Sequence, residues 1–225
     1  MPRRPKQDTY DAVDAFVQAT LLGPDPTLDA ANAAAAAAGL PAIQVSPAEA
    51  RLLSVLCGGI GARRILEFGT LAGYSTIALA RTLPDDGTLI TLEYDPDHAE
   101  VAWANIEAAG FADKVDLRVG AALETLPLLE SEAVEPFDFV FIDADKVNTA
   151  PYFSWSLDHT RPGGLIFADN VVRQGGLVDP DADEASAAQR DFLAYLADEP
   201  RVTATMIQTV GVKGHDGFAL AVVNR

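Results

Sequence analysis

After Gly61, the sequence alternates between short apolar runs and segments of helical length, and this rhythm restricts the possible folds more than any other feature. The apolar runs are residues 65–68, 88–94, 115–119, 137–142 and 165–168, and the segments between them are residues 74–82, 97–109, 121–129 and 151–160. Strands that are apolar along their whole length and alternate with helices predict a parallel sheet covered by helices on both faces.

The C-terminal part departs from this rhythm. After a helix predicted over residues 185–197, strands at 202–210 and 218–223 are separated only by the turn-rich segment 211–217. Because parallel strands need a long crossover, this pair should be antiparallel. The sequence therefore predicts a seven-stranded α/β sheet that ends in a reversed hairpin.

The first 60 residues carry no strand pattern and are predicted to be helical. Residues 30–38 are all alanine except Asn32, and alanine has the highest helix propensity. Ser46 followed by Pro47, with Glu49 three residues after the serine, predicts a helix start with a capping box. We divide the chain into an N-terminal helical extension, residues 1–60, which would cap the site or contact a second subunit, and a main ligand-binding domain, residues 61–225.

The charge balance restricts the function. The chain has 16 Lys and Arg against 33 Asp and Glu, a net charge of −17, whereas nucleic-acid and membrane-surface binders need a basic footprint. The small basic segment at Arg3, Arg4 and Lys6 is expected to be a solvated terminus. No apolar run reaches the ~20 residues that span a bilayer, and no secretory pattern is visible. We expect a cytoplasmic protein without nucleic-acid or membrane partners, and its one cysteine, Cys57, is expected to be buried.

A glycine-containing turn follows the first predicted strand. Gly69 and Gly73 allow a ligand to approach the backbone closely, and ligands of open parallel sheets bind beyond the carboxyl ends of the strands. Glu93, at the end of the second strand, could accept hydrogen bonds from two ribose hydroxyls. The pattern favours a nucleotide-like ligand at this edge.

Several ligands compete for this turn. A Walker phosphate loop is absent, and a dinucleotide fingerprint needs G-x-G-x-x-G, whereas this turn has G-x-x-x-G. Glu67 precedes the turn and would repel a pyrophosphate, but it would attract the ammonium group of S-adenosylmethionine. S-adenosylmethionine therefore fits best, and a turn without any ligand stays an alternative.

Acidic and amide side chains follow the fourth and fifth predicted strands. Asp143 and Asp145 come after one strand, and Asp169 and Asn170 come after the next. Carboxylate and amide oxygens suit Mg²⁺, Mn²⁺ or Ca²⁺, and the three histidines lack the spacing of a zinc site. Taken singly, each residue could be a turn or helix-cap residue. Together they predict a cation site beside the nucleotide-like ligand.

With both motifs in view, the chain resembles the class I S-adenosylmethionine-dependent O-methyltransferases, and within them the small bacterial type of the cation-dependent catechol and caffeoyl-CoA group. The matching segments, in family order, are residues 66–70, 73–75, 137–138, 143–146, 161–164 and 169–170. The resemblance implies a Rossmann-like, doubly wound seven-stranded sheet with its last strand antiparallel and with N-terminal helices. It also implies a homodimer that transfers a methyl group to a hydroxyl of a catechol-like or other hydroxylated aromatic molecule.

The resemblance also implies roles for individual residues. S-adenosylmethionine would be contacted by Val45, Glu67, Gly69, Thr70, Ser75, Glu93, Ala122 and Asp145. A divalent cation, with Mg²⁺ expected before Ca²⁺ or Mn²⁺, would be held by Asp143, Asp169 and Asn170. Asp143 and Lys146 would be catalytic, with Lys146 helping to remove the proton of the acceptor hydroxyl.

Departures from the family pattern concern the acceptor. Thr149 stands where many relatives carry a tyrosine, and residues 171–175 stand where the family often has a tryptophan, so both should lie near the acceptor. Arg173 could bind an acidic acceptor or be a surface arginine, and Lys213–His215 is an extra segment of open role. A nicotinamide-dependent oxidoreductase of Rossmann type and a non-catalytic binding domain that keeps the fold stay as alternatives.

Overall fold

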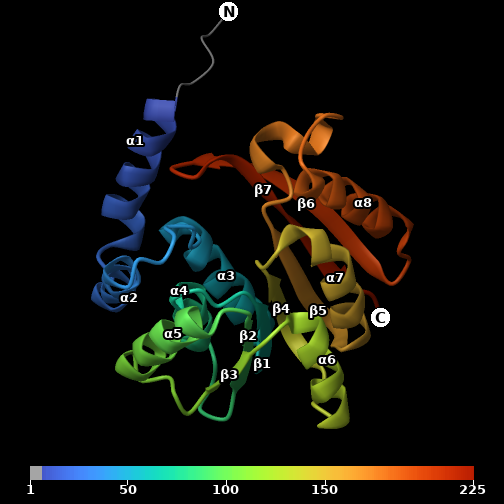
Figure 1. Ribbon diagram of the computed structural model, residues 1–225, viewed down its shortest axis with the longest axis horizontal. Coiled ribbons are helices and arrows are strands. Elements are labelled where there is room, and N and C mark those ends of the chain that lie inside the picture. Colours follow the sequence, from blue (N-terminus) through green and yellow to red (C-terminus); the bar gives the residue numbers. More distant parts are fainter. Residues whose placement is uncertain (1–6) are drawn as a thin grey trace, which may run out of the picture.

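Seven strands form one sheet in the order β3-β2-β1-β4-β5-β7-β6 in the computed structural model, which describes residues 7–225 (Figure 1). The strands are β1 Arg64–Phe68, β2 Thr88–Glu93, β3 Val115–Val119, β4 Phe137–Ile142, β5 Thr160–Asp169, β6 Val202–Gly211 and β7 Gly214–Val223. The predicted basic segment at Arg3, Arg4 and Lys6 lies outside the described residues.

The strand directions confirm the predicted fold class. Strands β1 to β5 pair in parallel, and β7 pairs antiparallel with both β5 and β6. The last strand is thus the reversed one. The strand order changes direction between β1 and β4, so the carboxyl ends of these two strands mark the switch point where doubly wound sheets bind ligands.

The predicted hairpin turn over residues 211–217 is wrong in its length. The pairing of β6 with β7 continues to Gly211 opposite Gly214, so only Val212 and Lys213 form the turn. Gly214 has φ +86°, a conformation that glycine adopts readily and that two-residue hairpins use. The polar residues His215 and Asp216, which look like part of a loop in the sequence, belong to β7 and pair with Val210 and Thr209 of β6.

Helices cover both faces of the sheet. They are α1 Gln7–Val17, which continues into the π-helical turn η1 Gln18–Leu22, α2 Pro26–Ala37, α3 Pro47–Ile60, α4 Tyr74–Ala80, α5 Pro96–Ala108, α6 Ala122–Ser131, α7 Thr149–Asp158 and α8 Glu184–Asp198. The short 3₁₀ segments η2 Lys146–Asn148 and η3 Arg173–Val178 follow β4 and β5. Within residues 7–225, no helix is both long and apolar enough to cross a membrane.

The core forms two layers, one on each face of the sheet. Along β4, Phe139 and Phe141 pack with α3, α4 and α5, while Val140 and Ile142 pack with α6, α7 and α8. Figure 1 shows the same division of helices. Cys57 of α3 is fully buried, as predicted, and burial raises the pKa of its thiol to about 12.

Helix α3 begins at the predicted position. The Ser46 hydroxyl accepts a hydrogen bond from the backbone N–H of Glu49 (3.2 Å), and Pro47 occupies the first turn. The Glu49 carboxyl lies beside the Ser46 backbone N–H, as the predicted capping box requires, and also beside Asp169 at the end of β5. The start of α3 therefore contributes a side chain to the edge of the sheet where the predicted cation site lies.

Candidate active site

The turn between β1 and α4 forms the first part of the site. Gly69 has φ +91°, and a side chain there would collide with the carbonyl oxygen of Asp143. Glu93 holds the turn from the end of β2: its Oε2 accepts hydrogen bonds from the backbone N–H groups of Thr70 (3.0 Å) and Leu71 (2.8 Å). Its Oε1 accepts from the N–H of Asp95 (3.0 Å). One buried carboxylate thus fixes the backbone of the turn.

Glu67 is fully buried behind this turn. Its Oε2 accepts hydrogen bonds from the hydroxyls of Thr76 (2.5 Å) and Thr91 (2.7 Å). Its Oε1 is buried too and has no hydrogen-bond partner among the described residues. Burial raises the pKa of Glu67 to about 7, although the nearby Ser75 hydroxyl and the hydrogen bonds from Thr76 and Thr91 oppose this. A buried acceptor without a donor is costly and marks a place where a ligand could donate.

A cavity of about 630 Å³ opens beyond the carboxyl ends of the strands. Its volume lies in the ~300–1,000 Å³ range of small-molecule sites. The predicted cofactor residues that line it are Val45, Gly69, Thr70, Ser75, Glu93, Ala122 and Asp145. Asp143, Lys146 and Asn170 line it as well. The structure thus brings these residues to one cavity, with Glu67 buried beside Ser75, and their individual roles stay predictions.

Part of the lining of this cavity was not predicted from the sequence. These residues are Ile43, Gln44, Leu71, Leu92, Tyr94, His98, Gly120, Ala121, Leu123, Ala144, Asn148 and Tyr152. The Tyr152 hydroxyl donates to Asp145 (2.5 Å), and its ring stacks on Phe68 with 4.7 Å between the centroids. Burial, followed by the hydrogen bond to Asp145, raises the pKa of Tyr152. Tyr152 lies in the first turn of α7, and only the short η2 segment separates α7 from Asp145, so closeness in the sequence was the one sign of this contact.

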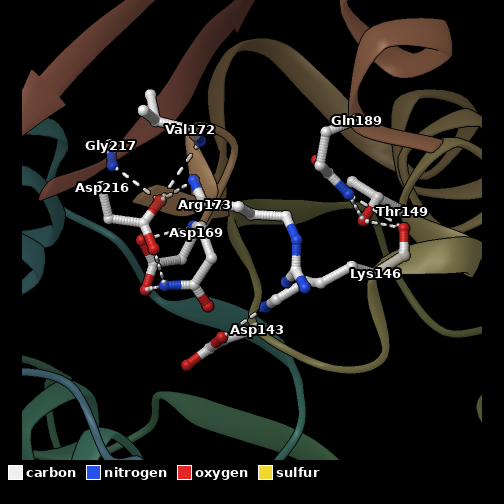
Figure 2. A network of polar contacts seen from close by, with 10 residues as sticks. Asp143, Lys146, Thr149, Asp169, Val172, Arg173, Gln189, Asp216 and Gly217 are labelled. Carbon is white, nitrogen blue, oxygen red and sulfur yellow. Dashed lines mark hydrogen bonds and ion pairs between the residues drawn. The ribbon is translucent and has the colours of Figure 1, made fainter. Parts of the chain in front are cut away.

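The predicted metal ligands meet at the ends of β4 and β5. These strands are neighbours, with Ile142 paired to Ala168, so Asp143 and Asp169 follow at the same edge. The Lys146 ammonium donates to Oδ1 of Asp143 (2.6 Å), and the side-chain amide of Asn170 donates to Oδ2 of Asp169 (3.1 Å). Figure 2 shows Asp143, Lys146 and Asp169 in this cluster.

Glu49 is a further carboxylate at this edge that the sequence analysis did not identify as a site residue. Burial, followed by the charges of Asp143 and Glu49, raises the pKa of Asp169 well above its usual value. Burial is also the main cause of the raised pKa of Glu49. Among the described residues, Lys146 is the cationic side chain that opposes the crowding of Asp143, Asp169 and Glu49. The raised pKa values mean that a proton offsets part of this charge, and a divalent cation could take its place.

The side chains that could bind a cation at this edge are two aspartates and one asparagine. Within residues 7–225, no three His, Cys, Asp or Glu side chains form a group that could hold a metal ion by themselves. Any cation at this edge would therefore depend on the amide oxygen of Asn170 together with the two aspartates. Such an all-oxygen set suits Mg²⁺, Mn²⁺ or Ca²⁺.

The residues that depart from the family pattern are mostly interior. Thr149 is 2% exposed and donates to the backbone carbonyl of Lys146 (3.1 Å), so its predicted position at the acceptor is wrong. Gln189 of α8 supports both residues, since its Nε2 donates to the Lys146 carbonyl and the Thr149 hydroxyl (2.9 Å each) (Figure 2). Val171 and Val172 are also buried, so their side chains do not face an acceptor.

Two further residues of open role have structural partners. Arg173 donates from Nε to the Ser186 hydroxyl (3.2 Å) and from Nη2 to Asp183 (2.9 Å), an arrangement that favours an anchoring role. Lys213 lies in the β6–β7 turn, where its Nζ donates to the carbonyl of Ala42 (3.3 Å). The Arg173 contacts hold η3 against the start of α8, and the Lys213 contact holds the β6–β7 turn against the segment before α3.

A second cavity, of about 240 Å³, adjoins the first on the metal side. Its walls are the start of α3 with Glu49, the β6–β7 turn, Asp14 of α1, and Asp169 with Asn170. The two cavities share Ile43, Val45 and Asn170. Ligands bound in the two cavities would therefore lie next to each other at Asn170, near the Asp143–Lys146 pair.

Comparisons with known proteins agree with this geometry. A family model described as O-methyltransferase matches residues 25–222. A catechol O-methyltransferase from Mycobacterium tuberculosis is 52% identical over 211 residues, covering 94% of each chain. A catechol O-methyltransferase from Niastella koreensis is 49% identical over 215 residues, covering 95% of this chain and 97% of its own.

Solved structures agree as well. An O-methyltransferase from Bacillus cereus in complex with SAH superposes with a TM-score of 0.95 at 49% identity, covering 97% of this chain and 100% of that one. The O-methyltransferase TomG from Streptomyces achromogenes, in complex with SAM and involved in tomaymycin synthesis, gives 0.94 at 43% identity, covering 99% and 100%. The resemblance inferred from the sequence is confirmed, and the chain belongs to the O-methyltransferase family.

Proposed function

We propose that this O-methyltransferase moves the methyl group of S-adenosylmethionine to a hydroxyl of a catechol-like or other hydroxylated aromatic molecule, with the help of a divalent cation. The observation that supports this most is the junction of two cavities at Asn170, beside the Asp143–Lys146 pair. One cavity would hold the methyl donor and the other the acceptor. The names of the catechol O-methyltransferase relatives support the acceptor class.

The larger cavity fits S-adenosylmethionine. The unpartnered Oε1 of Glu67 could accept a hydrogen bond from the methionine ammonium, and Glu93 could bind the ribose hydroxyls. Val45 and Ala122 would supply apolar walls around the nucleoside. When bound, the cofactor supplies a methyl group already activated on a sulfonium. A pyrophosphate beside buried Glu67 would be repelled, which disfavours the nicotinamide-dependent alternative.

The edge formed by Asp143, Asp169 and Asn170 fits a hydrated divalent cation. We propose Mg²⁺ first, because it keeps several waters and needs few protein ligands, with Mn²⁺ or Ca²⁺ as substitutes. When bound, the cation supplies positive charge that favours the ionised form of the acceptor hydroxyl.

Lys146 is the proposed base. Its Nζ lies 2.6 Å from Oδ1 of Asp143, Lys146 lines the cofactor cavity, and its charge opposes the raised pKa of Asp169, which lines the second cavity. With a cation beside Asp143, Nζ of Lys146 could take the proton of the acceptor hydroxyl. The rest of the protein aligns the two substrates, which is a large source of rate in group transfer.

The N-terminal extension, residues 1–60, is proposed to cap the acceptor cavity and to contact a second subunit. Asp14 of α1 lines that cavity and accepts a hydrogen bond from the N–H of Val212 (2.8 Å). The same helix exposes Val13 and Phe16. We propose a cytoplasmic homodimer with a small-molecule substrate and no nucleic-acid or membrane partner. Light scattering that gives a single 23.8 kDa species at micromolar concentration would contradict the dimer.

The activity test uses the purified chain with S-adenosylmethionine, Mg²⁺ and a panel of catechols and hydroxylated aromatic acids, with products identified by mass spectrometry. We expect a mass gain of one methyl group on at least one catechol. Absence of product across the panel with metal present would favour a non-catalytic domain. Tight binding of NAD in calorimetry, with no response to S-adenosylmethionine, would favour the oxidoreductase alternative.

A further inference from the structure

Asp216, near the start of β7, is surrounded by hydrogen-bond donors. Its Oδ1 accepts from the backbone N–H groups of Val172 (3.2 Å), Arg173 (2.9 Å) and Gly217 (2.9 Å). Its Oδ2 accepts from the side-chain amide of Asn170 (3.3 Å). Figure 2 shows Asp216 beside Asp169, with Val172, Arg173 and Gly217 around it. An ionised carboxylate has about two acceptor positions on each oxygen, so the backbone fully occupies Oδ1, and Oδ2 is bonded to Asn170.

The segment held by Asp216 has an unfavourable backbone conformation. Asn170 has φ +59°, Arg173 has φ +52° and Gln174 has φ +57°, all in the left-handed region. Asparagine tolerates this region better than most residues, but arginine and glutamine do not. Such a conformation persists only where the surroundings stabilise it. The bonds from Asp216 to the N–H groups of Val172 and Arg173 provide this stabilisation.

The fourth bond fixes the orientation of the Asn170 side chain. An asparagine amide has an oxygen on one side and an NH₂ group on the other, and a flip exchanges them. The Nδ2 of Asn170 donates to Asp169 (3.1 Å) and to Asp216 (3.3 Å), so the NH₂ group faces both carboxylates. The Oδ1 atom lies on the other side of the amide from this NH₂ group, and only this oxygen can ligate a cation.

We propose that Asp216 is a positioning residue for the cation site: it holds Asn170 in the backbone and side-chain orientation that presents Oδ1 to the cation. The proposal rests on the proposed function, because it presumes that Asn170 is a metal ligand. Asp216 acts through Asn170 and the loop, since its own oxygens are already bonded to the protein.

The decisive variant is Asp216→Asn. Its carbonyl oxygen can still accept from the three backbone N–H groups, so the loop should keep its fold. Its NH₂ group, however, would face the NH₂ group of Asn170 and push that amide towards the flipped orientation. Asp216→Asn should therefore disturb the side-chain orientation of Asn170 while the backbone of the loop stays in place.

Asp138→Asn is the matched control. Asp138 of β4 is a buried aspartate, whereas Asp216 is half-buried, and like Asp216 it accepts from backbone N–H groups: its Oδ2 bonds those of Arg63 (2.7 Å) and Arg64 (2.8 Å). It also pairs with Arg161 and lies at the start of β4, whereas Asp143 follows the end of that strand. Its loss should lower the thermal stability without changing the cation site.

The measurements are Mn²⁺ affinity by electron paramagnetic resonance, S-adenosylmethionine affinity by calorimetry, and melting temperature, on the full chain. For Asp216→Asn we expect Mn²⁺ affinity to fall about 10- to 100-fold, as is usual when a residue that orients a metal ligand is lost, while S-adenosylmethionine affinity stays within about threefold. The KM for Mg²⁺ should rise in parallel, with kcat largely recovered at saturating Mg²⁺. Asp138→Asn should keep the Mn²⁺ affinity of the unaltered protein.

Two results would overturn the proposal in distinguishable ways. Mn²⁺ affinity of Asp216→Asn within twofold of the unaltered protein, or an equal loss in Asp138→Asn, would show that Asp216 has no specific effect on the cation site. No saturable Mn²⁺ binding by the unaltered protein would remove the cation site itself, and the present proposal with it.

Discussion

The two halves of the site satisfy their buried carboxylates in different ways. On the cofactor side, Glu67 is bonded by two threonine hydroxyls and Glu93 by three backbone N–H groups. On the metal side, Asp169 lies against Glu49 and near Asp143, with Lys146 as the cation that opposes them. On the cofactor side the protein therefore satisfies these carboxylates except for Oε1 of Glu67, whereas on the metal side the carboxylates lie against one another and a bound cation would offset their charge.

This difference has a consequence for experiments. Changes on the metal side should weaken cation binding and remove the reaction but spare cofactor binding, whereas changes on the cofactor side should weaken cofactor binding but spare cation binding. Gly69, whose backbone touches Asp143, connects the two sides and should affect both.

The largest effect is expected from loss of the cation site. Asp169→Ala, or chelation of the metal in the native protein, should abolish methyl transfer, because one of two carboxylate ligands is lost. S-adenosylmethionine affinity should stay within about tenfold, or ~1.4 kcal/mol, since Glu67 and Glu93 are untouched. Turnover by mass spectrometry and calorimetry measure the two effects.

Asp158→Ala is the control for this variant, because Asp158 is exposed and pairs with Arg201 at the end of α7. It should keep full activity. Full activity of the native protein in excess EDTA, with elemental analysis showing no bound metal, would contradict the cation assignment and leave Asp169 and Asn170 as a turn.

The next largest effect is expected on the cofactor side. Glu67→Gln keeps the shape of the side chain but removes the charge that faces the methionine ammonium. A hydrogen bond to a charged group contributes about 1.5–3 kcal/mol, so S-adenosylmethionine affinity should fall roughly 10- to 150-fold. Mn²⁺ affinity should not change. Unaltered S-adenosylmethionine affinity would show that Oε1 of Glu67 does not meet the ammonium, and Glu107→Gln, on α5 and exposed, is the control.

The sequence was sufficient for those residues whose position follows from strand ends. Gly69, Glu93, Asp143 and Asp169 each follow or end a parallel strand, and the carboxyl ends of parallel strands meet at one edge of the sheet. Once the strands are identified in the sequence, it follows that these residues lie near one another.

The residues that were not predicted lie on helices and strands whose position in the fold cannot be inferred from the sequence. Asp216 reaches the site because β7 inserts between β5 and β6, and this order cannot be read from spacing alone. Glu49 matched a capping box, and that local pattern concealed its contact with Asp169. Thr149 was placed at the acceptor by its position in the family pattern, whereas α8 covers it with Gln189.

A smaller effect, shared by both halves, is expected from Gly69→Ala. The left-handed backbone at φ +91° and the collision with the Asp143 carbonyl should cost about 1–3 kcal/mol of unfolding free energy. Gly59→Ala is the matched control, because a Cβ there meets nothing within 4 Å in helix α3, and it should be about 0.5–1 kcal/mol more stable. Denaturant unfolding measures both. Equal stability of the two variants would show that the turn can move away from β4.

The last expected effect is the pH dependence that Glu67 contributes on the cofactor side. The pKa of Glu67 is about 7 in the folded protein against 4.5 in the unfolded chain, so the folded state binds this proton more tightly between these values. The stability contributed by Glu67 should therefore be present below pH 4.5 and decline as the pH rises towards 7. Glu67→Gln carries no such charge, so it should match the unaltered protein near pH 5 and exceed it in melting temperature at pH 8.

A cationic ligand reverses the preference of Glu67, because it stabilises the ionised carboxylate. S-adenosylmethionine affinity of the unaltered protein, taken relative to Glu67→Gln so that the titration of the ligand itself cancels, should increase from pH 6 to pH 8. The increase cannot exceed about tenfold per pH unit for a single proton. A ratio that stays constant over this range would show that the ligand does not approach Glu67, and it would place the ammonium elsewhere in the cavity.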